Sequence, residues 1–237
     1  MPEKSTKPAI QPKEKKNYTT SVISTKNNTT KYQLENGAIL LITKNPSNDI
    51  IALEMSSRGG NSIEKIPGIA SITAETMMKG THKYKTQELS QLLEENGIRI
   101  SPSVNGDSFG ISAKFTKNEK DLALDIFEEI ALNASLDAFD VERVKSDKMV
   151  LIKNRNNTPQ ALAFDEFKTA LWQGTPYGNT GKVLETTIAS IQRDDVLEYY
   201  NNLFDAKNVV ISINGNVDEQ EFINYFSEIL ESSSSPK

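Results

Sequence analysis

Apolar residues recur along this chain at two spacings, one typical of strands and the other of helices. The strand-like segments are residues 32–35, 38–43, 50–56, 98–104, 108–115 and 208–214. The helix-like segments are residues 68–78, 86–95, 118–130, 141–152, 159–172, 191–200 and 218–230. Because strands and helices do not alternate regularly, this order predicts an α+β fold with helices packed on one face of an antiparallel sheet, rather than a doubly wound parallel sheet.

Turn residues lie between these segments. Asn36-Gly37 predicts a type I′ hairpin turn, which needs positive φ at both central residues, and Asn105-Gly106-Asp107 predicts a comparable turn between the later strands. Thr158-Pro159 predicts the start of a helix. We expect Trp172 to lie in the core, and Tyr177 to pack the loop that follows onto the core.

The two ends of the chain are polar. Residues 1–26 hold six lysines and two glutamates, and the Thr/Asn-rich stretch that follows adds little apolar area. Such a segment cannot offset its ordering entropy by burial, so we predict a flexible linker or tail over residues 1–29. A folded domain is expected over residues 30–231, and residues 232–237 are predicted to form a second, disordered tail.

Composition removes several classes of chemistry. The chain has no cysteine and one histidine, His82, so it cannot build a disulfide, a thiolate or multi-histidine metal site, or a cysteine nucleophile by itself. His82 has no second ligand at helical or hairpin spacing, and we expect it to be solvated. The net charge of −5, with dispersed acids, argues against a nucleic-acid partner.

Membrane and targeting signals are also missing from the sequence. No apolar run approaches the roughly 20 residues that cross a bilayer, so we expect no transmembrane segment. Residues 1–30 lack the apolar core of a signal peptide. The compartment stays unassigned.

Several short strings occur in a characteristic order. They are Leu34-Glu-Asn-Gly-Ala38, Gly68-Ile-Ala70, Lys79-Gly-Thr81, Pro159 with Ala161 to Phe164, Thr175-Pro-Tyr-Gly178, and Asn208 to Asn216. In this order they resemble one domain of the pitrilysin/insulinase-type metallopeptidases, the inverted zincins that include the mitochondrial processing peptidases. The resemblance covers residues 33–230 and implies a LuxS/processing-peptidase-like α+β fold.

Active domains of that family carry His-x-x-Glu-His on the helix that here follows Gly68. The two histidines lie at i and i+4 and bind zinc from one helix face, and the glutamate acts as general base. Without a gap, the resemblance places Ser71 and Glu75 at the histidine positions and Ala74 at the general base. We therefore expect a degenerate motif, and we favour a helix-surface Ser/Glu pair over an altered metal site.

The family's third zinc ligand is a glutamate on a later helix. Counting from Thr158-Pro159 places Leu151 at that position. The resemblance therefore implies no catalytic residue, no metal ligand and no cofactor in this chain, with zinc held by an active partner domain.

The resemblance implies a non-catalytic domain or subunit that helps form a peptide-enclosing chamber with an active peptidase-like partner. An extended peptide is expected to bind by strand addition at the edge of the 98–115 strand pair, with Val104 and Asn105 as candidate contacts. Two alternatives stay open. One is a zinc metalloendopeptidase with an atypical or partner-completed site, and the other is a scaffold or assembly module.

Overall fold

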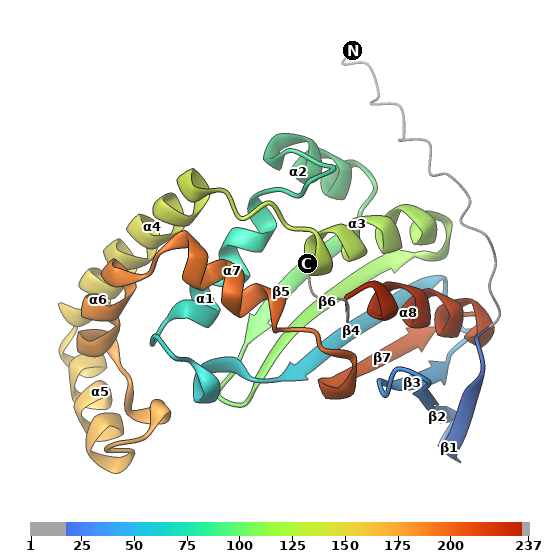
Figure 1. The fold of residues 1–237 in the computed structure, drawn as a ribbon, viewed down its shortest axis with the longest axis horizontal. Coiled ribbons are helices and arrows are strands. Elements are labelled where there is room, and N and C mark those ends of the chain that lie inside the picture. Colours follow the sequence, from blue (N-terminus) through green and yellow to red (C-terminus); the bar gives the residue numbers. More distant parts are fainter. Residues whose placement is uncertain (1–17, 234–237) are drawn as a thin grey trace.

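A seven-stranded sheet organises the protein, whose computed structural model describes residues 18–233 (Figure 1). The strands are β1 (Thr20–Lys26), β2 (Thr29–Leu34), β3 (Ile39–Lys44), β4 (Ile50–Arg58), β5 (Arg99–Val104), β6 (Ser108–Thr116) and β7 (Val209–Gly215). Their order in the sheet is β1-β2-β3-β7-β4-β6-β5. The β3–β7 pair is parallel and the other pairs are antiparallel, which confirms the predicted α+β class and its mainly antiparallel sheet.

Eight α-helices accompany the sheet in the described residues. They are α1 (Ile69–Thr76), α2 (Thr86–Glu95), α3 (Lys120–Leu132), α4 (Ala138–Asn156), α5 (Pro159–Leu171), α6 (Gly181–Ser190), α7 (Arg193–Asn201) and α8 (Glu219–Ser233). The sequence did not indicate α6, because its Thr-Thr-Ile run of β-branched residues weakens the helical signal. No helix between residues 18 and 233 combines the length and the apolar character that crossing a membrane requires.

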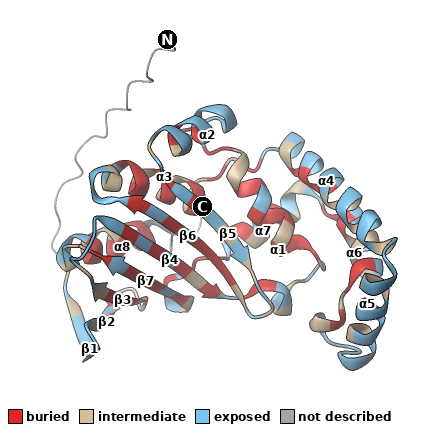
Figure 2. Cartoon of the chain, turned by 180° about the vertical axis from the view of Figure 1, so that it is seen from behind, coloured by how far each residue is buried: buried red, intermediate tan, exposed pale blue. Residues whose placement is uncertain are grey.

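The helices α3 and α8 lie over one face of the sheet, and no helix among residues 18–233 covers the opposite face (Figures 1 and 2). Side chains alternate between these faces along each strand. In β7, for example, Ile211 and Ile213 are buried, whereas Val210 and Ser212 are exposed. The core therefore lies between the sheet and the helices on its covered face.

The strand β1 makes the predicted boundary at residue 29 wrong. It pairs with β2 from Thr20 opposite Leu34 to Lys26 opposite Thr29. Its side chains are mostly exposed. The strand forms all the same, because its pairing with β2 uses backbone hydrogen bonds, which do not need an apolar side-chain pattern. Residues 1–17 of the predicted tail lie outside the described residues, as do 234–237, while α8 continues to Ser233.

The predicted turns also need correction. Asn36 does not have positive φ, although Gly37 does (φ 98°), and the Leu34 and Gly37 N–H groups donate to the Ala38 and Leu34 carbonyls. This loop is therefore longer than a two-residue type I′ turn. Positive φ at both central residues occurs instead at Asn27-Asn28, between β1 and β2 (φ 50° and 59°). None of the residues in Asn105-Gly106-Asp107 has positive φ.

The predicted core position of Trp172 is wrong, since its side chain is 45% exposed. Tyr177 packs on the Trp172 ring, with 5.5 Å between the ring centroids, and donates a hydrogen bond to the Asp107 carboxylate. The expected apolar face of α4 is buried at Val141 and Val144 and exposed at Val150. Helical periodicity locates an apolar face but does not say whether the chain itself covers it.

Candidate functional site

The helix α1 carries three of the predicted site positions, and its first turn is firmly held. The Glu64 carboxylate accepts hydrogen bonds from the backbone N–H groups of Gly68 and Ala70, each at 2.9 Å. Burial raises the pKa of Glu64, although these two hydrogen bonds oppose the shift. Gly68 has φ 96°, and a Cβ there would lie 2.8 Å from the side chain of Ile188 in α6, so both conformation and packing favour glycine.

Ser71 and Glu75 lie one turn apart on α1, as expected, but neither side chain is arranged to bind zinc. The Ser71 hydroxyl donates to the Gly68 carbonyl oxygen at 2.9 Å, so it bonds back to its own helix. The Glu75 carboxylate forms an ion pair with the ammonium group of Lys148 on α4. Ala74 is buried and offers no group that could accept a proton.

The structure does not bring Leu151 together with these residues. Its side chain is 61% exposed, whereas Lys148, one turn earlier on α4, reaches Glu75. The position opposite the degenerate motif is therefore occupied by a cation. Lys148 was not anticipated from the sequence, because a count along the chain does not fix the rotational phase of α4 relative to α1.

A divalent metal does not fit this arrangement. An ammonium group already neutralises the Glu75 carboxylate, and a hydroxyl that donates to a carbonyl is a poor ligand. Within residues 18–233, no group of three or more His, Cys, Asp or Glu side chains could hold a metal ion. His82 is exposed, as expected, and its backbone N–H donates to the Asn133 carbonyl at 3.0 Å.

The sheet edge that was predicted to bind peptide exists, but part of it is not available for strand pairing. Among the described strands, β5 pairs with β6 and forms one edge of the sheet. Val104 is half-buried at its end, and Asn105 is exposed in the loop that follows. The Asn105 carbonyl already accepts a hydrogen bond from the Asn61 N–H at 3.0 Å. Pro102 lies in β5 and has no N–H to donate, a feature that protects edge strands from pairing.

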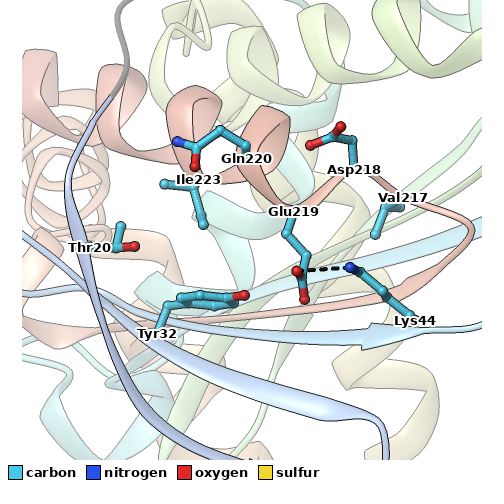
Figure 3. Close-up of a pocket in the computed structure, with 8 residues that line it drawn as sticks. All are labelled: Thr20, Tyr32, Lys44, Val217, Asp218, Glu219, Gln220 and Ile223. Atoms are coloured by element: carbon cyan, nitrogen blue, oxygen red, sulfur yellow. Dashed lines mark ion pairs between the residues drawn. The ribbon is translucent and has the colours of Figure 1, made fainter.

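A polar cavity of about 390 Å³ lies among β1, β2, β3 and the start of α8 (Figure 3). Lys44 and Glu219 face each other in it, with 2.9 Å between Nζ and Oε2. Burial and then the charge of Glu219 raise the pKa of Tyr32, whose ring lies beside this pair. Asp218 also lines the cavity, and its carboxylate accepts a hydrogen bond from the Glu221 N–H in the first turn of α8 at 3.2 Å. The charged groups of the cavity are therefore a neutralised ion pair and a carboxylate that caps α8, which is not the arrangement of an acid–base catalytic site.

A family model described as "Insulinase (Peptidase family M16)" matches residues 40–182, which is more than half of the chain. The chain belongs to peptidase family M16. A second model, described as "Peptidase M16 inactive domain", matches residues 190–237. The predicted resemblance is thereby confirmed. The positions of the family's zinc motif hold Ser71, Ala74 and Glu75 in this chain, so the motif is degenerate.

Some curated M16 relatives are named as peptidases and others as non-peptidase homologues. The chain is 22% identical over 167 residues to "Non-peptidase homolog YmxG" of Helicobacter pylori, covering 70% of this chain and 39% of that protein. It is 26% identical over 163 residues to "Mitochondrial-processing peptidase subunit beta" of Lentinula edodes, covering 68% and 34%. It thus spans less than half the length of these relatives.

Solved structures share the fold. The peptidase M16 inactive domain from Pseudomonas fluorescens matches with a TM-score of 0.80 and 18% identity, over 86% of this chain and 50% of that one. Pitrilysin matches with a TM-score of 0.72 and 14% identity, over 92% and 24%.

Proposed function

We propose that this chain is a non-catalytic M16 domain that helps enclose extended peptide together with a zinc-bearing partner domain or subunit. The observation that carries the proposal is the Glu75–Lys148 ion pair, which places a side-chain cation opposite the motif. A zinc ion would have to displace Lys148 and would gain a single carboxylate in exchange. The name "non-peptidase homolog" of the Helicobacter pylori relative agrees with this role.

The partner is proposed on two grounds. The curated relatives named above are more than twice as long as the segment they share with this chain, so they have room for a further domain. The open face of the sheet also offers exposed polar positions, such as Ser112 and Lys114 on β6, that could line a solvent-filled chamber with another domain.

Metal content and activity test the non-catalytic role. We expect the purified protein to retain far less than one zinc per chain after it is incubated with zinc and the free metal is dialysed away. We also expect it to leave fluorogenic peptides uncut. One tightly held zinc per chain, with peptide cleavage that a chelator abolishes, would contradict the proposal. It would instead support the alternative of a peptidase with an atypical site.

Mixing experiments test the chamber role. A zinc-bearing M16 subunit that co-purifies with this chain should cleave an extended peptide faster in the complex than alone. Equal rates in the presence and absence of this chain would leave a scaffold or assembly role as the better explanation.

A further inference from the structure

A second cavity, of about 330 Å³, lies between α7 and the segment that joins β4 to α1. Its apolar lining comes from both sides and consists of Ile63, Ile66, Ile69, Tyr199 and Leu203. Ile69 and Leu203 are buried, whereas Ile63 is 61% exposed. A cavity of this volume with mainly apolar walls has the size and lining that are typical of a ligand-binding site.

Contacts within the protein hold the walls of this cavity in place. The Tyr199 hydroxyl donates a hydrogen bond to the Gly60 carbonyl oxygen at 3.4 Å, and the Tyr199 ring packs edge-on against Phe109. At the surface, the ammonium group of Lys65 and the carboxylate of Glu198 lie 2.5 Å apart and join the two sides of the cavity. A ligand would therefore enter a preformed site, and little conformational entropy would be lost in ordering its walls.

Four charged side chains line the cavity, and three of them already have partners. Lys65 pairs with Glu198, and the Asp195 carboxylate accepts a hydrogen bond from the Gln192 N–H at 2.8 Å. Arg58 is exposed, and none of residues 18–233 forms a hydrogen bond or an ion pair with its guanidinium. A free guanidinium beside an apolar cavity favours a ligand that joins an apolar group to a carboxylate, because a guanidinium binds a carboxylate through two parallel hydrogen bonds.

Asn202 supplies a hydrogen-bond acceptor at the same cavity. Its side-chain amide donates to the Glu198 carbonyl oxygen at 2.7 Å, and no described residue donates to its Oδ1 atom. A carboxylate, an apolar side chain and a backbone N–H occur together at the C-terminal residue of a peptide. A free amino acid carries an ammonium group instead, which fits less well because the carboxylates of Asp195 and Glu198 already have partners.

We propose that this cavity binds the apolar C-terminal residue of a peptide, with its carboxylate on Arg58 and its backbone N–H on Asn202. The exposed residues of β4 alternate with buried ones and include Glu54 and Arg58, so Arg58 belongs to the open face of the sheet. The cavity therefore lies at one end of the face that would line the chamber. In taking a peptide as the ligand, this inference rests on the proposed function, which it extends by giving one end of that peptide a site.

Calorimetric titration of this chain alone with acetylated tetrapeptides tests the ligand chemistry. We expect acetyl-Ala-Ala-Ala-Leu to bind with a Kd below about 1 mM. Its C-terminal amide should bind at least about 10-fold more weakly, because the charge-assisted hydrogen bonds to Arg58 are lost. A terminal serine in place of leucine should weaken binding about as much, because it buries less apolar surface.

Three results of these titrations would overturn the proposal. They are equal Kd values for the acid and the amide, no binding up to about 5 mM peptide, and binding of free leucine as tight as that of the peptide. The last result would assign the cavity to amino acids rather than to peptides.

Substitution of Arg58 tests the site itself. Arg58→Gln should raise the Kd of the acid peptide at least about 10-fold and leave that of the amide unchanged, a difference that a general loss of folding would not produce. Arg143→Gln is the matched control, since Arg143 is also an exposed arginine but lies on α4, outside the cavity. An unchanged Kd in Arg58→Gln, or an equal rise in Arg143→Gln, would contradict the proposed site. Circular dichroism confirms that each variant is folded.

Failure here can be told apart from failure of the proposed function. The titrations need no partner, so a negative result removes this site and leaves the zinc and mixing experiments to decide the chamber role. Conversely, if the acid peptide binds through Arg58 while the mixing experiment shows equal cleavage rates, the site stands and the chamber role is contradicted.

Discussion

The Glu75–Lys148 pair leads to a prediction about restoring a metal site. Ser71→His and Glu75→His together place two imidazoles at i and i+4 on α1, the spacing that binds zinc from one helix face. Lys148→Glu then supplies a carboxylate from α4, at the residue that contacts position 75. We expect this triple variant to bind one zinc per chain.

The magnitude follows from the charge at residue 148. For a lysine ammonium about 4 Å from a doubly charged zinc ion, repulsion is about 8 kcal/mol at an effective dielectric constant of about 20 and about 2 kcal/mol in water. The Glu75 side chain is 46% exposed and that of Lys148 is 22% exposed, so solvent and salt screen this site and we take the lower figure, about 2 kcal/mol. Removing the lysine charge should thus tighten zinc binding about 30-fold, and the added ligand should bring the gain above about 100-fold.

The comparison variant keeps the two histidine substitutions and Lys148 but replaces Leu151 with Glu. Leu151 points into solvent, so this variant should bind zinc no better than the double variant. Competition with a zinc-chelating dye at pH 7.5 gives each Kd. If the Leu151→Glu variant binds zinc as tightly as the Lys148→Glu variant, the inferred phase of α4 against α1 is wrong.

Three further outcomes are expected from single substitutions. Tyr200→Phe should lower the free energy of unfolding in urea by about 1–3 kcal/mol, because it leaves the buried Ala134 N–H and Ile130 carbonyl without their partner; a loss below about 0.5 kcal/mol would contradict this. The raised pKa of Glu64 means that its contribution to stability is fully present below the ordinary glutamate pKa and is lost as pH rises through the folded value. The stability of Glu64→Gln relative to the unsubstituted protein should therefore rise as the pH increases above the ordinary glutamate pKa of about 4, and a flat difference would refute the argument. Gly60→Ala should lower the melting temperature and cost more than about 1 kcal/mol, because φ is +63° and a Cβ would clash with the β5–β6 loop; an unchanged melting temperature would argue against that packing.

Local patterns determined much of the fold. The strands β3, β4, β6 and β7 and most helices follow from the spacing of apolar residues over short windows, since that spacing reflects which side of an element is buried. The loss of the zinc motif was also readable, because His-x-x-Glu-His is a local helical pattern whose positions here hold Ser71, Ala74 and Glu75. The family resemblance could also be identified from short sequence strings and the order in which they occur.

Tertiary structure decided what depends on partners distant in sequence. β1 forms because a neighbouring strand edge accepts its backbone, whatever its polar composition. Lys148 faces Glu75 because of the way α4 is rotated relative to α1. Residue spacing along the chain does not determine that rotation. The apolar residues Phe164 and Phe167 on α5 were readable from the sequence, but their exposure was not. Asp165 is buried in their place, where it pairs with Arg155, and burial is a property of neighbours rather than of a residue's own sequence.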